Sequence, residues 1–150
     1  MPTPSDLTSH LGYWLRYVSN HVSQAFARKL EGRGVTVAEW VMLRELYNVE
    51  TIAPSRLSEQ MGMTRGAITK LADRLIAKTL ITREANPNDA RAQTLTLTPA
   101  GRDLVPELSA LADRNEAEFF GHLTLNERQC LERVLKDIVA YRGLTSIPLS

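Results

Sequence analysis

The segment that most limits the possible folds of this chain runs from residue 57 to residue 104. Two helical patterns follow each other there, separated by Gly62, which indicates a tight turn between helices. The first is opened by Pro54, because proline suits a first helical position. The second begins at Thr64, whose hydroxyl can cap free backbone N–H groups. We therefore expect two consecutive helices with almost no linker between them.

The second of these helices is amphipathic. Its apolar residues recur at three- and four-residue spacing, which indicates one buried face; they are Ala67, Ile68, Leu71, Leu75 and Ile76. The opposite face is polar and carries Arg65, Thr69, Lys70, Asp73 and Arg74. Such side chains donate hydrogen bonds to base edges and phosphates, and the small Gly66 and Ala67 let a backbone approach a DNA groove. A merely solvated polar face explains the same pattern, so the helix alone does not decide the function.

A β-hairpin is expected directly after this helix. Residues 81–83 form one short strand and residues 92–97 the other, with Leu95 and Leu97 directed inward by their alternation with threonines. The tip between them consists of the turn formers Asn86, Pro87, Asn88 and Asp89. This order of two helices, hairpin and further helix is typical of a winged helix-turn-helix.

Arg91 follows the tip of the hairpin, and its guanidinium is narrow enough to enter a minor groove. Asp89 can hold this guanidinium in a bidentate pair and set its direction. The alternative is an exposed ion pair that contributes about 0–1 kcal/mol.

Two motifs resemble those of the MarR family of bacterial transcription regulators. The wing motif is Asp89-x-Arg91-x-x-x-Leu95-x-Leu97-Thr98-x-x-Gly101. The helix-turn-helix motif is Leu57…Gly62-Met63-Thr64-Arg65…Leu71…Arg74-Leu75…Leu80-Ile81-x-Arg83. With the flanking helices, the resemblance covers nearly the whole chain. Thr79 departs from it where a glycine is common, which we expect to mean a less strained turn.

The resemblance implies a mainly α fold with a small β-hairpin wing. Residues 1–150 are then a single domain, with a winged helix-turn-helix at about 36–102 and dimerisation helices at about 7–33 and 104–143. It also implies a homodimer that represses transcription from a pseudo-palindromic operator in double-stranded DNA and releases it when a small aromatic or phenolic anion binds. The residues expected to contact DNA are Ser55, Thr64, Arg65, Gly66, Ala67, Thr69, Lys70, Arg74, Asp89 and Arg91.

The charge distribution favours the same segment. The whole chain carries only +1, but residues 53–102 hold eight Lys and Arg against four Asp and Glu, whereas residues 103–150 hold five against eight. A local basic excess is the electrostatic footprint of a nucleic-acid binder.

Long amphipathic patterns at residues 7–30 and after residue 104 need a partner for their apolar stripes, and a second copy of the chain is the simplest one.

A possible effector site lies on the first long helix. Helical spacing brings His10, Trp14, Tyr17 and His21 into a narrow arc, which suits a flat aromatic ligand. Tyr13, Arg16 and Trp40 are expected to join it, with Arg16 pairing with a ligand carboxylate or phenolate. The alternative is that the stripe packs at a dimer interface. A metal is not expected, because His10 and His21 lie about 16 Å apart along a helix.

Other functions find little support in the sequence. There is no nucleophile beside a base, no phosphate-binding glycine loop and no metal-ligand spacing, so we expect neither an enzyme nor a cofactor. We expect a cytoplasmic protein, since neither a secretory signal nor a membrane span is evident. Cys130 is expected to be a small, partly buried residue; the alternative is a reactive thiol near the start of the last helix. The alternative function is a winged-helix module for protein interaction or dimerisation without sequence-specific DNA binding.

Overall fold

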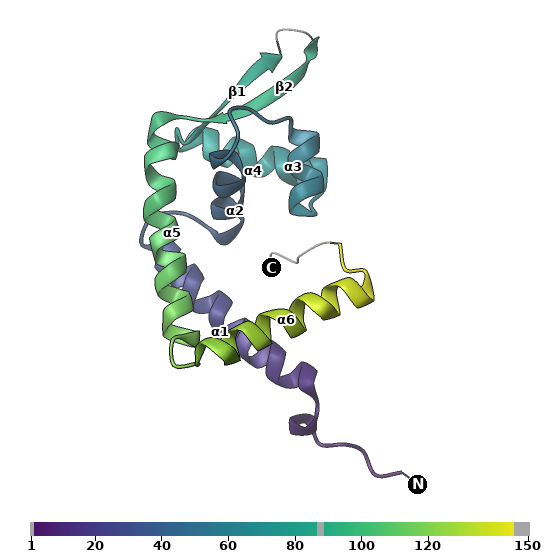
Figure 1. The fold of residues 1–150 in the computed structure, drawn as a ribbon. Coiled ribbons are helices and arrows are strands. Elements are labelled where there is room, and N and C mark those ends of the chain that lie inside the picture. Colours follow the sequence, from purple (N-terminus) through teal and green to yellow (C-terminus); the bar gives the residue numbers. More distant parts are fainter. Residues whose placement is uncertain (1, 87–88, 146–150) are drawn as a thin grey trace.

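The computed structural model describes residues 2–86 and 89–145, with side chains for all of these except residue 86 and residues 89–92. After a short 3-10 turn, Leu7–Ser9, the elements are α1 Leu11–Glu31, α2 Val37–Tyr47, α3 Pro54–Met61, α4 Arg65–Ala77, β1 Ile81–Asn86, β2 Asp89–Leu97, α5 Pro99–Phe120 and α6 Leu125–Arg142. The predicted fold class, mainly α with a two-stranded wing, is confirmed. We call α2, α3, α4 and the hairpin the winged lobe (Figure 1).

The helix ends follow local chemistry. Gly62 ends α3 in the left-handed conformation, at φ 63°. Thr64 then caps α4, accepting a hydrogen bond from the backbone N–H of Ala67 at 3.1 Å. Two Thr-x-x-Glu patterns in the sequence form capping boxes, in which the threonine and the glutamate satisfy each other's backbone N–H groups; they are Thr36 with Glu39 and Thr124 with Glu127.

The hydrophobic core lies in the winged lobe, at the C-terminal end of α1 and in the first half of α5. α4 contributes Ile68, Leu71, Ala72 and Leu75, all at most 3% exposed, so its predicted buried face is confirmed. The strands are longer than expected, and the inward direction of Leu95 and Leu97 is confirmed. Leu95 also exchanges backbone hydrogen bonds of 2.8 and 3.1 Å with Ile52, a pairing that the sequence did not predict.

The turn between α4 and β1 corrects one expectation. The prediction of a less strained turn at Thr79 is wrong, because Thr79 has φ 60°, a left-handed conformation that a β-branched side chain disfavours. The carbonyl of Thr79 accepts a hydrogen bond from the Thr98 hydroxyl at 2.7 Å. A Cβ on Gly101 would overlap the carbonyl of Leu80, so α5 begins against the backbone of this turn.

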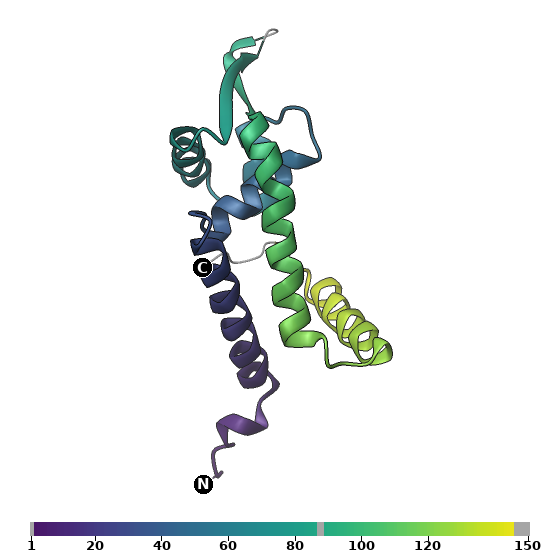
Figure 2. The same cartoon turned by 90° about the vertical axis from the view of Figure 1, so that its left-hand side faces the viewer.

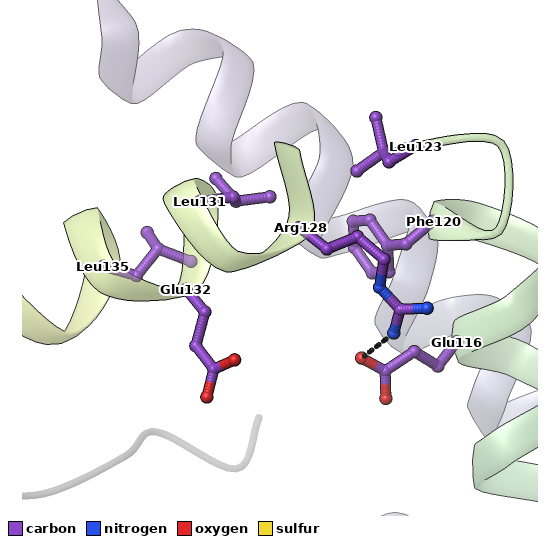
Figure 3. A pocket seen from close by; sticks show the side chains of 7 residues that line it. All are labelled: Glu116, Phe120, Leu123, Arg128, Leu131, Glu132 and Leu135. Atoms are coloured by element: carbon purple, nitrogen blue, oxygen red, sulfur yellow. Dashed lines mark ion pairs between the residues drawn. The ribbon is translucent and has the colours of Figure 1, made fainter. Parts of the chain in front are cut away.

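Two long helices extend from the winged lobe. α1 and α5 lie side by side in both views (Figure 1, Figure 2). α5 continues through Pro106 without interruption, whereas α6 turns away from it. α6 contains no buried residue in a single chain, and Leu131 and Leu135 border an open pocket of about 370 Å³ between α5 and α6 (Figure 3). Within the described ranges, no helix is long and apolar enough to span a membrane.

Candidate nucleic-acid interface and effector groove

The outer face of α4 begins with four exposed residues, Arg65, Gly66, Thr69 and Lys70. These residues face outward because the opposite side of α4 is packed into the core. Arg65 and Lys70 make no ion pair with any described side chain, so both cations are available to a phosphate or a base edge. A Cβ on Gly66 would meet no described atom within 4 Å, so nothing in this part of the chain requires glycine there.

The two threonines of this face use their hydroxyls inside the protein. Thr64 caps the helix, and the hydroxyl of Thr69 donates to the carbonyl of Arg65 at 3.0 Å. Ala67 is half-buried, and Ser55 is exposed at the start of α3. Of the expected DNA contacts, the structure therefore gathers Arg65, Gly66, Thr69 and Lys70 on one exposed surface.

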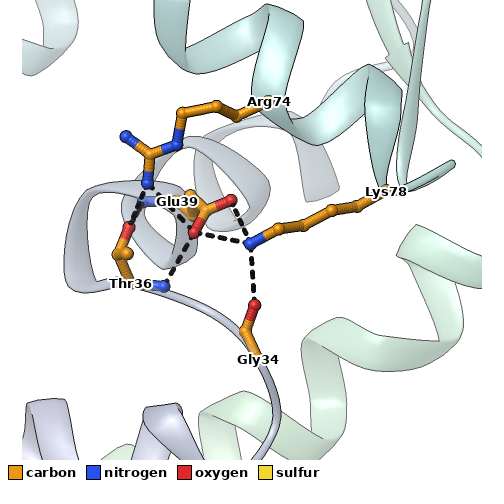
Figure 4. A network of polar contacts seen from close by, with 5 residues as sticks. All are labelled: Gly34, Thr36, Glu39, Arg74 and Lys78. Carbon is orange, nitrogen blue, oxygen red and sulfur yellow. Dashed lines mark hydrogen bonds and ion pairs between the residues drawn. The ribbon is translucent and has the colours of Figure 1, made fainter.

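Arg74 lies further along α4 and points toward α2. Its Nη2 atom is 3.2 Å from Oε1 of Glu39 and donates to the hydroxyl of Thr36 at 3.2 Å (Figure 4). Glu39 is fully buried, and Lys78 donates to both of its oxygens. Burial would raise the pKa of Glu39, but hydrogen bonds from Lys78 and Thr36 outweigh it and hold the pKa below its ordinary value.

The hairpin forms the wing, which extends away from α3 and α4 at the end of the molecule opposite α6 (Figure 1). Asp89 and Arg91 belong to β2 by their backbone, but their side chains lie outside the described part of the chain, so their expected pairing stays a prediction. Arg83 on β1 forms an ion pair with Asp73 on α4 at 2.7 Å. This pair ties the base of the wing to α4.

The expected effector residues are only partly brought together. Tyr13, Arg16, Tyr17 and His21 line an open groove of about 270 Å³ on α1, with Asn20 and Gln24. Within it, the rings of Tyr17 and His21 stack with centroids 5.0 Å apart.

The other three expected members do not line this groove. Trp14 donates its indole N–H to the carbonyl of Thr8 at 2.9 Å, and His10 precedes the first residue of α1. Trp40 lies edge-on to Phe26, with ring centroids 6.3 Å apart.

Another pocket lies between α1, α2 and α5, and none of the residues predicted to bind a ligand lines it. It has a volume of about 310 Å³ and is lined by Val22, Ser23, Phe26, Val37, Ala112, Asn115, Glu116 and Phe120. Asn115 is 3% exposed, donates to the carbonyl of Val22 at 3.1 Å and accepts from Lys29 at 2.9 Å. A buried amide on the apolar face of a predicted helix was the available signal for this contact.

Cys130 differs from its expectation. It lies on α6 and is exposed in a single chain, rather than partly buried. Its sulfur lies 3.7 Å from Nη2 of Arg133. Within the described part of one chain, this thiol is therefore not enclosed by packing.

Comparisons with known proteins agree with this geometry. The sequence model described as MarR family matches residues 35–92. The chain is 30% identical over 143 residues to a putative transcriptional regulatory protein for the hcr operon of Thauera aromatica, covering 95% of this chain and 85% of the relative. It is 29% identical to the HTH-type transcriptional repressor MdtR of Bacillus subtilis, covering 85% and 82%. The crystal structure of a mutant Escherichia coli MarR with operator DNA superposes with a TM-score of 0.79 and 27% identity, over 90% of this chain and 99% of that one.

Proposed function

The chain belongs to the MarR family of DNA-binding transcription regulators, which are not enzymes, and from this we propose that it is a homodimeric repressor of a pseudo-palindromic operator. A small aromatic or phenolic acid bound beside α1 releases the operator. The observation that carries this proposal is the outer face of α4, where Arg65, Gly66, Thr69 and Lys70 are exposed on a helix whose other face is buried.

The apolar surface of the long helices supports the dimer. On α6, Leu131, Val134, Leu135, Ile138 and Val139 are 39–47% exposed, and on α1 Leu11 is 81% exposed. Contiguous apolar surface of this kind marks an interaction site. A two-fold axis through these helices presents two copies of α4 to successive major grooves, about 34 Å apart.

The operator is bound by the polar face of α4 together with the wing. Arg65 and Lys70 supply cations without an intramolecular partner among the described side chains, and Arg91 supplies the wing contact. The mutant E. coli relative was crystallised in complex with operator DNA, and the B. subtilis relative is by name a repressor. Both descriptions fit the same use of this surface.

The effector site that we propose is the groove on α1. Its stacked Tyr17 and His21 suit a flat ring, and Arg16 can pair with a carboxylate or phenolate. Since α1 also carries the exposed apolar stripe of the proposed dimer, a ligand there changes the separation of the two winged lobes. Operator affinity falls when both copies of α4 no longer fit one operator.

A titration with DNA tests the proposal. The full chain is mixed with the DNA upstream of its own gene and with a scrambled duplex, with and without a panel of phenolic acids, while sedimentation reports the oligomeric state. We expect a dimer that prefers one duplex and releases it for at least one acid. Equal affinity for the two duplexes over a range of salt concentrations contradicts the proposal and favours the protein-interaction module instead.

A further inference from the structure

An ion cluster around one buried carboxylate joins the C-terminal end of α4 to the beginning of α2 (Figure 4). Its centre is Glu39, whose side chain is 0% exposed. The Nζ atom of Lys78 lies 2.8 Å from Oε2 and 3.0 Å from Oε1 of this carboxylate, and Nη2 of Arg74 lies 3.2 Å from Oε1. Both cations therefore come from α4 or its C-cap, and both converge on one residue of α2.

The same cluster also reaches the turn that connects α1 to α2. Lys78 donates a further hydrogen bond to the carbonyl of Gly34 at 2.7 Å, and Arg74 donates to the hydroxyl of Thr36. The backbone N–H of Thr36 donates to Glu39 at 2.9 Å. The buried carboxylate of Glu39 thus accepts hydrogen bonds from Lys78 and from the backbone of Thr36. A buried charge is tolerated when it is paired and hydrogen-bonded in this way.

The ion cluster restricts the orientation of α4 more than apolar packing does. Ile68, Leu71 and Leu75 hold the helix against the core, but contacts between apolar side chains have little directionality. Hydrogen bonds with a charged donor are directional. Those from Lys78 to Glu39 and from Arg74 to Thr36 therefore restrict the rotation of α4 about its axis and its position along it. Base recognition depends on these two coordinates, because the exposed face must point at particular base edges.

We propose that Glu39 is a positioning residue for operator recognition: by holding Lys78 and Arg74 it sets the orientation in which α4 presents its exposed face to DNA. Arg74 then acts on Glu39 and Thr36 rather than on a phosphate, although its side chain is 51% exposed on the polar side of the helix. This inference rests on the proposed function. It makes DNA recognition by α4 depend on Glu39, which lies 26 positions before Arg65 in the sequence.

The first test compares specific with non-specific binding. Glu39→Gln keeps the size of the side chain but removes its charge, and Lys78→Met removes the cation while leaving the carboxylate to Arg74. Dissociation constants are measured for a duplex selected by the wild-type protein from a random pool and for a scrambled duplex, at a temperature where melting curves show each variant folded. Arg33→Met is the matched control, because Arg33 pairs with Glu107 at 2.6 Å near the same turn rather than with the Glu39 cluster.

We expect both cluster variants to lose preference for the selected duplex by about tenfold, the discrimination that one good base contact provides. Affinity for the scrambled duplex is expected to stay the same, and the control to match the wild type. A merely structural role would weaken both affinities in proportion, and that outcome overturns the proposal, as does an unchanged preference in both folded variants. A wild-type protein that selects no duplex at all contradicts the proposed function instead.

The second test concerns Arg74 and uses the dependence of affinity on salt. Each phosphate contact contributes about 0.9 to the slope of log affinity against log salt. Lys70→Gln is expected to lower the slope by about this amount per protomer, whereas Arg74→Gln is expected to leave it unchanged. An equal reduction for Arg74→Gln overturns the internal role assigned to Arg74.

Discussion

Gly66→Ala should make the protein more stable and a poorer repressor. Gly66 is the second residue of α4 and has an ordinary helical conformation, and its missing side chain would meet nothing within 4 Å in the described part of this chain. Replacing a helical glycine by alanine gains about 0.5–1 kcal/mol of folding free energy, with the lower figure suited to a first turn. A glycine that costs stability without an internal need is explained if DNA approaches its backbone closely.

The expected loss of affinity follows from the same contact. A methyl group forced into a packed contact costs about 1 kcal/mol or more. A dimer carries two such residues, so operator binding should weaken by about 2 kcal/mol, or roughly 30-fold. Melting curves and gel-shift titrations on the same preparations measure the two effects, which have opposite signs.

Gly12→Ala is the matched control for this experiment. Gly12 is also the second residue of a long helix, α1, and a Cβ there would likewise meet nothing within 4 Å among the described residues. It should raise the melting temperature similarly and leave operator affinity unchanged, with sedimentation checking that the dimer persists. If Gly66→Ala binds the operator as tightly as the wild type, the first turn of α4 does not approach DNA closely and the reasoning is refuted.

Four further changes test other parts of the structure. Gly101→Ala should destabilise the fold by about 1–3 kcal/mol in chemical denaturation, because its Cβ would overlap the backbone of Leu80; an unchanged midpoint would contradict this. Thr79→Gly should stabilise it by about 0.5–1 kcal/mol, since glycine relieves the positive φ; a lower midpoint would show that the side chain matters more. Arg91→Ala should weaken operator binding in gel shifts and leave the dimer intact in sedimentation; unchanged binding removes the wing contact. The lowered pKa of Glu39 stabilises the fold above the ordinary value of 4.5 and ceases to do so as pH falls through the folded value, so acid unfolding should be steeper in wild type than in Glu39→Gln.

Local sequence patterns predicted the elements of the winged lobe well. Helical spacing identified the buried face of α4, and the capping boxes at Thr36 and Thr124 marked helix starts that the structure confirms. These features depend on residues within one turn of each other, so they can be recognised without knowing the fold. The prediction for Thr79 was wrong although its cause is also local. Thr79 follows the C-cap of α4 in a Schellman motif, in which the backbone N–H of Thr79 donates to Ile76 at 2.9 Å and that of Leu80 donates to Leu75 at 3.0 Å. This motif needs a left-handed residue after the C-cap, whichever side chain stands there.

The effector groove shows how far helical spacing alone can mislead. The spacing correctly put Tyr17 and His21 beside each other, and their rings stack. It also correctly put Trp14 beside Tyr17, with ring centroids 6.2 Å apart, but Trp14 does not line the groove and its indole N–H donates to the carbonyl of Thr8. Trp40 contacts Phe26 because of the angle between α1 and α2, which no pattern within a single helix contains.

Glu39 could have been singled out from the sequence by a conflict between two rules. Its role as the second half of a capping box predicts an exposed carboxylate at a helix start, yet its spacing to Met42, Leu43 and Leu46 places it on the buried face of α2. A carboxylate on an apolar face needs a cation from another element. The sequence does not name that cation, because Lys78 lies 39 residues away and reaches Glu39 only once α4 has packed against α2. A charged residue at the spacing of a buried face therefore indicates that a partner exists, and only the fold identifies which one.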